Sequence, residues 1–257
     1  MRATVSQPLQ HRRGSQIAWL AGVDGCRGGW FAVLQGRGQA SPRVVEVRFA
    51  LCRGFSEVMN LPENPVPIAV DIPIGLLEQA EPGGRSCDRA ARVLLGRGRA
   101  SSIFTPPTRA ALQGQSYREA MRLNGAGMSK QTFNLMGKIR EVDALIEPAL
   151  QQRIFEAHPE LAFLTLAGRP LRHNKKTPAG GREREALLGP RFGAAFIKPS
   201  EVRDCFPRSQ VGADDVLDAY ALALTARRIH AGSAMRLPAP EPERDFRRIF
   251  LNRILLT

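Results

Sequence analysis

The chain has 257 residues, of which 43% are hydrophobic and 24% are charged, with a net charge of +13. These proportions are typical of a globular protein and exclude a disordered one, and the length suits one large domain. No stretch approaches the ~18 uninterrupted apolar residues of a membrane span, and the N-terminus lacks the apolar centre of a signal peptide, so we expect a cytoplasmic protein. The charge favours a polyanionic partner such as nucleic acid, although an arginine-rich proteome would give the same excess without a ligand.

The first part of the chain predicts strands. Residues 1–16 are polar and basic without a hydrophobic period, so we expect a flexible basic leader ahead of a single domain at 17–257. Apolar or alternating segments that predict three strands in meander order lie at 17–25, 29–36 and 43–50. A short helix is expected at 54–62. The apolar run at 66–75 predicts a fourth strand, which ends at Asp71 and has the composition of a parallel strand buried on both faces.

From residue 83 to about 152 the pattern becomes helical, which predicts a helical insertion between the fourth and fifth strands. Ser86 can cap a first helix that closes at Gly96. Ser129 can cap a second helix, in which apolar residues recur at helical spacing. The fifth strand is expected at 153–160.

The last part of the chain predicts a loop and a long helix. The segment at 168–185 is basic and glycine-rich, and we expect it to be mobile. Residues 213–232 predict a helix with an acidic first turn, an apolar body and Gly232 as its stop. The elements together predict an α/β fold, with a mixed five-stranded sheet flanked by helices.

Acidic residues stand where predicted strands or helices reach an edge of this sheet. They are Asp24, Asp71, Glu156, Asp214, Asp215 and Asp218. Side chains at strand ends and helix starts of an α/β sheet can converge in one crevice, and two residues three apart on a helix share a face. Carboxylates held close together repel one another unless a cation neutralises them, and Mg²⁺ or Mn²⁺ prefers oxygen ligands. The pattern therefore suggests a divalent-metal site for phosphoryl-transfer chemistry.

Each acidic residue also has a purely structural interpretation. Asp24 precedes Gly25, and Asp-Gly is a common hairpin turn. Asp214 can be a helix N-cap, Asp215 can complement the helix dipole, and Glu156 can form a salt bridge to one of the many arginines. Asp71 can begin a turn, but a charge directly after an apolar strand is costly unless it is solvated or paired. Asp218 lies one turn into the helix among apolar neighbours, where neither capping nor a solvated face explains it.

Basic residues offer weaker signals. Arg27 begins an Arg-Gly-Gly corner that could bring backbone N–H groups near a phosphate. Lys175 and Lys176 in the basic segment could contact a phosphate backbone, and a solvated loop is the structural alternative. Lys138 and Arg140 are expected to form surface pairs with neighbouring acids on their helix.

Seven ordered blocks of the sequence resemble one known family. They are AGVDGCRGGW, AVDIPIGL, CDRAARVLLG, SSIFTPPTR, GMSKQTFNLMGKIREVD, EAHPELAF and DDVLDAYALALTA, which together span about residues 18–230. Their order and spacing are similar to those of the DUF429 family, described as predicted nucleases with a ribonuclease H-like fold. The last block also resembles the final helix of RuvC-type resolvases and YqgF-type proteins. Gly137 stands where relatives carry Pro, and the C-terminal tail does not align.

The resemblance implies roles for individual residues. Asp24 resembles a first-strand metal ligand, Asp71 a fourth-strand ligand, and Asp215 with Asp218 the ligands on the final helix. Glu156 has no secure counterpart among the relatives, so it is a weaker catalytic candidate than the four Asp residues. The expected function is a nuclease that uses Mg²⁺ or Mn²⁺ and an activated water to hydrolyse phosphodiester bonds. The nucleic-acid backbone would be held by Arg27, Lys175 and Lys176.

Two other functions stay open at this point. The first is a nucleotide-binding phosphotransferase of the actin and sugar-kinase superfamily, which usually needs two such lobes, whereas this chain shows one. The second is a non-catalytic nucleic-acid-binding module, against which the clustered acids argue, because a binder of polyanions gains nothing from an acidic crevice. The sequence leaves open the type of nucleic acid and the oligomeric state, a homodimer included.

Overall fold

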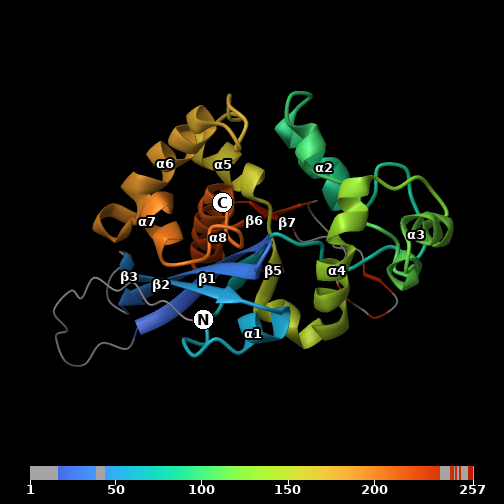
Figure 1. The fold of residues 1–257 in the computed structure, drawn as a ribbon, viewed down its shortest axis with the longest axis horizontal. Helices are drawn as coiled ribbons and strands as arrows, with labels where there is room; N and C mark the ends of the chain where they lie inside the picture. Colours follow the sequence, from blue (N-terminus) through green and yellow to red (C-terminus); the bar gives the residue numbers. More distant parts are fainter. Residues whose placement is uncertain are drawn as a thin grey trace.

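A five-stranded mixed sheet forms the centre of the protein (Figure 1). The computed structural model describes residues 17–38, 44–237, 244, 245, 247, 249 and 254–256, so the expected leader at 1–16 lies outside the described residues. The strand order is β3-β2-β1-β4-β5. The strands are β1 (Ile17–Cys26), β2 (Gly29–Gly38), β3 (Val44–Cys52), β4 (Ile68–Val70) and β5 (Ile154–Glu156). The first three form an antiparallel meander and the last two run parallel to β1, which confirms the predicted α/β class and mixed sheet.

The hairpin between β1 and β2 turns later than the Asp-Gly pair suggested. β1 continues to Cys26, and Asp24 pairs with Phe31 inside the ladder. At the turn itself, Gly29 has a φ of +127°, and a Cβ there would lie 2.1 Å from the carbonyl oxygen of Cys52. The interpretation of Asp24 as a hairpin-turn residue is therefore wrong, because Gly29 supplies the backbone freedom that the turn needs.

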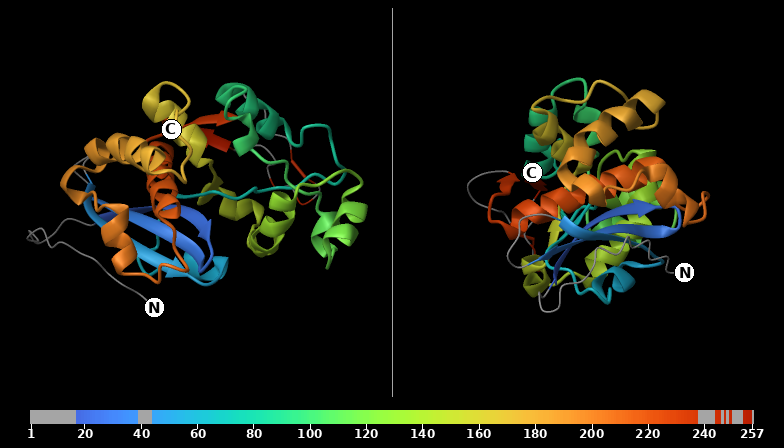
Figure 2. Two further views of the ribbon diagram at one scale, coloured as in Figure 1. Left: turned by 45° about the horizontal axis from the view of Figure 1, so that its top comes forward. Right: turned by 90° about the vertical axis from the view of Figure 1, so that its left-hand side faces the viewer.

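Helices cover both faces of the sheet (Figure 2). On one face, α1 (Phe55–Met59) and α4 (Lys130–Leu145) pack over an apolar cluster that includes Trp30, Ala32 and Leu34. The other face, with Phe31 and Val33, is covered by α8 (Ala213–His230) and by the helices around it. Alternate residues of β2 therefore enter different cores, as the pleat of a strand requires.

Between β4 and β5 the chain is mainly helical. It forms α2 (Ser86–Leu95), α3 (Tyr117–Asn124) and α4, with 3-10 turns at η1 (Ala100–Ser102), η2 (Ala110–Gln113) and η3 (Pro148–Gln152). Ser129 caps α4 as predicted, since its hydroxyl accepts from the N–H of Thr132 at 3.0 Å. The cap expected at Ser86 is wrong: α2 begins at Ser86, and its N-cap is Arg85, whose N–H donates to Asp88 Oδ2 at 3.0 Å.

The segment after β5 contains more helix than the sequence suggested. It holds α5 (Pro159–Ala167), α6 (Pro178–Phe192), the turn η4 (Gly193–Ala195) and α7 (Pro199–Asp204). The helix α6 starts inside the stretch 168–185 that was expected to be mobile, because Thr177 caps it and Pro178 occupies its first turn. A second sheet joins β6 (Met235–Leu237) to β7 (Ile254–Leu256). Among the described residues, no helix combines the length and apolar character needed to cross a bilayer.

Candidate active site

Asp24 and Asp71 come from neighbouring parallel strands. Val23 of β1 is in register with Val70 of β4, and the N–H of Asp71 donates to the carbonyl of Val23 at 3.0 Å. Asp24 and Asp71 each follow one of these paired residues, so they occupy equivalent positions and their side chains leave the sheet on the same face. Both line a cavity of about 340 Å³ at this edge of the sheet.

The helix α8 brings two more carboxylates to the same cavity. It crosses β1 at Gly22, where a Cβ would lie only 2.0 Å from the backbone nitrogen of Ala223 and 2.2 Å from the carbonyl oxygen of Ala219. Glycine at this position therefore sets how closely the helix approaches the strand. Asp215 and Asp218 lie in the first turns of α8 and both line the cavity, and Asp218 is 1% exposed.

Asp215 also closes the N-terminus of α8. Its Oδ2 accepts from the N–H of Gly212 at 2.8 Å, and Gly212 is the N-cap residue. The alternative in which Asp214 is the N-cap is therefore wrong, because the helix starts at Ala213, two residues earlier than that assignment required. Asp214 is partly exposed and is not among the residues that line the cavity.

Lys175 enters the carboxylate cluster from the segment before α6. Its Nζ lies 2.6 Å from Asp218 Oδ2. The other oxygen of that carboxylate, Oδ1, is buried and has no hydrogen-bond partner in the part of the chain that the structure describes. One buried carboxylate thus carries both an ion pair and an unsatisfied acceptor.

Burial, followed by the charges of neighbouring acids, raises the pKa values of the four carboxyls. The pKa of Asp24 is raised well above its ordinary value by burial, then by the charges of Asp71 and Asp218. Burial also raises the pKa of Asp218 to about 6, against the opposing effect of Lys175. The pKa values of Asp71 and Asp215 are raised as well, in both cases by burial first. Burial alone would lower the pKa of Lys175, but Asp218 and Asp24 outweigh it and raise that pKa, so the ammonium stays charged.

The residue types at this site fit a hard divalent cation, but the distances between their side chains do not. The converging side chains are carboxylates, which Mg²⁺ and Mn²⁺ prefer, and Asp218 Oδ1 is an acceptor in need of a partner. Within the described ranges, however, no three His, Cys, Asp or Glu side chains are grouped closely enough to hold an ion. The donor set is present, and Lys175 supplies the positive charge beside it.

The wall of the cavity adds polar and basic side chains. Arg99 and Asn174 were not predicted as site residues, Lys138 and His158 also belong to this wall, and Lys176 lines it as the sequence suggested. The assignment of Lys138 to a surface pair is wrong: its Nζ donates to the carbonyl of Gly29 at 2.5 Å and lies over the ring of Trp30. These residues come from separate elements, so tertiary structure alone brings them together.

The structure does not bring Glu156 into this group. It is paired with Val70 in register, one residue before Asp71, so its side chain leaves the sheet on the opposite face. Its Oε2 accepts from the N–H of Ile74 at 2.7 Å and from Arg85 Nη1 at 2.8 Å. The salt bridge to an arginine, which the sequence left open for Glu156, is present.

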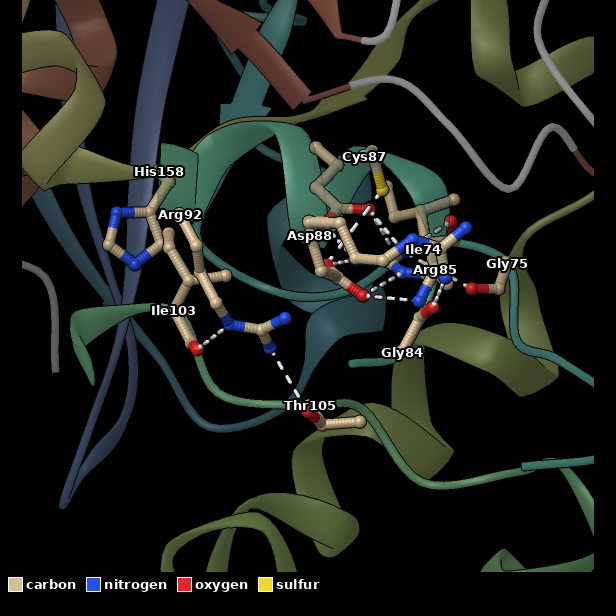
Figure 3. A network of polar contacts seen from close by, with 12 residues as sticks. Ile74, Gly75, Gly84, Arg85, Cys87, Asp88, Arg92, Ile103, Thr105 and His158 are labelled. Atoms are coloured by element: carbon tan, nitrogen blue, oxygen red, sulfur yellow. Dashed lines mark hydrogen bonds and ion pairs between the residues drawn. The ribbon is translucent and has the colours of Figure 1, made fainter. Parts of the chain in front are cut away.

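Arg85 is the centre of this separate network. Its guanidinium binds Asp88 and donates to the carbonyl oxygens of Ile74 and Gly75 at 3.1 and 3.2 Å (Figure 3). A buried arginine with this many partners holds the chain after β4 against α2. Arg27, the remaining substrate-binding candidate, is exposed at the β1–β2 turn and is not among the residues that line the cavity.

Comparisons with known proteins identify one family. The family model described as "Protein of unknown function (DUF429)" matches residues 22–243. No curated protein and no solved structure matches the chain. Because the family model covers most of the sequence and includes all four converging carboxylates, the chain belongs to the DUF429 family.

Proposed function

We propose that this protein is a divalent-metal-dependent nuclease that hydrolyses phosphodiester bonds of nucleic acid, and that its mixed sheet is of the ribonuclease H-like type. The observation that carries the proposal is the convergence of Asp24, Asp71, Asp215 and Asp218 on one cavity. These are the four positions that the family resemblance assigned to metal ligands, and they come from three different elements. A purely structural role for each acid would give no reason for all four to meet.

Mg²⁺ or Mn²⁺ would be held by Asp24, Asp71 and Asp218, with Asp215 beside them. Such an ion supplies Lewis-acid activation of a water molecule and neutralises charge on the reacting phosphate. Asp218 supports this assignment, because its Oδ1 is a buried acceptor that lacks any other partner among the described groups. Asp215 accepts from the Gly212 N–H, which fixes its carboxylate at the start of α8.

The basic residues of the cavity support an anionic substrate. Lys176 is exposed at the wall, and Lys175 lies between the acids and the open space of the cavity. Carboxylates alone would repel a phosphate, so a productive site needs positive charge around them. Arg27 lies outside the cavity and would contact a nucleic-acid backbone that extends beyond it.

The test is metal-dependent cleavage by purified protein of single-stranded, duplex, hybrid and junction substrates in Mg²⁺ or Mn²⁺. We expect Asp24→Asn and Asp71→Asn each to lower the rate at least about 100-fold, because each removes a charged group from the reacting centre. Asp214→Asn is the matched control, since it removes the same charge from the first turn of α8 but does not line the cavity. Its rate should stay close to that of the wild type.

Two outcomes would contradict this function. Undiminished cleavage in Asp24→Asn would show that the carboxylate cluster is not the reacting centre. Absence of cleavage on every substrate by a protein that binds Mn²⁺ would favour the phosphotransferase alternative, with a nucleotide or another small phosphoester as its substrate.

A further inference from the structure

Lys175 is placed where a metal-binding carboxylate site would hold its cation. Its Nζ is 2.6 Å from Asp218 Oδ2, and its positive charge lowers the pKa values of Asp24 and Asp71 as well. The side chain of Asp218 is 1% exposed, whereas that of Lys175 is 36% exposed. The ammonium therefore meets the buried acids on one side and the open cavity on the other.

The backbone around Lys175 holds the ammonium in this position. The carbonyl of Asn174 accepts from Thr177 N at 3.0 Å and from Thr177 Oγ1 at 2.8 Å. Gly180 packs directly on that carbonyl, since a Cβ there would lie 1.9 Å from it. Arg99 donates to the carbonyl of His173 at 2.6 Å from the opposite wall. The lysine is thus presented by a fixed turn, and the ion pair does not depend on a chance contact of a loose loop.

A second cation at Asp218 would compete with this ammonium. Two positive charges a few ångströms apart repel each other strongly beside buried carboxylates, where the effective dielectric constant is lower than in bulk water. Asp218 Oδ1 could receive an ion while Oδ2 still binds Lys175, but each cation would weaken the binding of the other. Because the Lys175 side chain is partly exposed to the cavity, the ammonium has space to move away from Asp218 without unfolding the turn.

We propose that Lys175 is the resident counter-ion of the acidic site and that a divalent cation binds only in competition with the Lys175–Asp218 ion pair. This proposal rests on the proposed metal-dependent function and adds to it a regulation of metal affinity. Lys175 keeps the buried carboxylates neutralised while no ion is bound. When it is displaced toward the cavity, its ammonium becomes a positioning group for an anionic substrate.

The experiment is a titration of the full chain with Mn²⁺, with free Mn²⁺ followed by electron paramagnetic resonance at mildly alkaline pH. We expect Lys175→Met to bind Mn²⁺ about tenfold more tightly than the wild type, because the competing charge is gone. Lys175→Arg, which keeps the charge, should bind like the wild type. Lys198→Met is the matched control, since it removes the same charge from an exposed residue that does not line the cavity, and it should change the affinity less than about twofold.

The double variant Lys175→Met, Asp218→Asn shows whether the effect passes through the ion pair. The gain from Lys175→Met should disappear when Asp218 is already Asn, which is the non-additivity expected of two directly interacting groups. Thermal unfolding of each variant confirms that it is folded before it is titrated. The readout is metal affinity, so it does not depend on a known substrate.

The outcomes separate this inference from the function on which it rests. If the wild type and Lys175→Met bind Mn²⁺ equally tightly, the competition is refuted and the proposed nuclease stands. If Lys175→Met binds more weakly, Lys175 supports the metal site, and the inference is also refuted. If neither protein binds Mn²⁺ at any accessible concentration, the metal dependence fails together with the inference.

Discussion

Asp24 is a buried acid of β1, and its negative charge lowers the free energy of unfolding. Burial and the charges of Asp71 and Asp218 raise its pKa well above the ordinary value of 3.8. In the metal-free protein the folded chain therefore keeps the proton at pH values at which the unfolded chain has lost it. The free energy of unfolding must then fall as the pH rises from the unfolded pKa to the folded pKa.

Replacement of Asp24 by Asn removes this penalty. We expect Asp24→Asn to raise the free energy of unfolding by about 1 kcal/mol at neutral pH in the absence of metal, because it removes a buried charge that neighbouring acids repel. The gain should vanish as the pH falls below the ordinary Asp pKa of 3.8, where Asp24 is protonated in both states. Urea unfolding across this pH range measures it. Asp204→Asn is the control, because Asp204 forms only an exposed ion pair and its replacement should change the free energy of unfolding little. If the stability gained by Asp24→Asn does not change with pH, the raised pKa of Asp24 is not its cause.

Individual site residues differ in how far the sequence could predict them. Asp218 could be predicted, because a charge one turn into a helix and among apolar neighbours has no capping or solvation role. The contact of Lys175 with it could not, since the turn that presents the ammonium is fixed by Arg99 from a distant segment. Glu156 carried the same strand-end signal as Asp71, but the register of β5 turns it to the other face. A shift of one residue in register decides which of the two reaches the cavity.

At the scale of elements, short polar segments were harder to predict than long apolar ones. The strands β1 to β3 and the helix α8 follow from their apolar periods. The helix α6 was missed because Gly180, Gly181 and several charges hide its periodicity, while Gly180 is required by the close contact with the Asn174 carbonyl. The tertiary contact of Gly180 therefore outweighs the low helix propensity of glycine, and tertiary contacts often outweigh propensity in this way.

The contact between β1 and α8 depends on a single glycine. Gly22→Ala would place a methyl group 2.0 Å from the nitrogen of Ala223 and 2.2 Å from the oxygen of Ala219, and the backbone of a helix cannot yield locally. We expect this substitution to lower the free energy of unfolding by about 3 kcal/mol and to displace Asp215 and Asp218 from Asp24. Circular dichroism during chemical unfolding measures the loss.

Gly137→Ala is the matched control for that substitution. Gly137 lies in α4 with open space where its Cβ would be. Alanine is the better helix former, so the same chemical change should raise the free energy of unfolding by about 0.5–1 kcal/mol. Two Gly→Ala substitutions with effects of equal sign would contradict the close packing of α8 on β1.

At the scale of the whole molecule, the net charge and the size of the cavity restrict the proposed substrate in different ways. The net charge of +13 gives long-range attraction to any nucleic acid, and this attraction weakens with salt without choosing between strands. The size of the cavity restricts the substrate more than the net charge does. The acids lie in a cavity of about 340 Å³, which is lined by residues of the η1 region, of α4, of the start of α5 and of the turn at 174–176. A space of this size holds a ligand no larger than a small molecule or a nucleotide.

A phosphodiester inside a duplex would therefore have to leave its helix to reach the acids. Unpairing costs a few kcal/mol, so we expect kcat/KM for a single-stranded oligonucleotide to exceed that for a duplex of the same sequence by about tenfold or more. A duplex with an unpaired flap should be cleaved within the flap. The comparison is made at one salt concentration, because both substrates bind more weakly as salt rises. Equal rates on both substrates would contradict this prediction, since they would mean that a paired strand reaches Asp24 and Asp71 without leaving its helix.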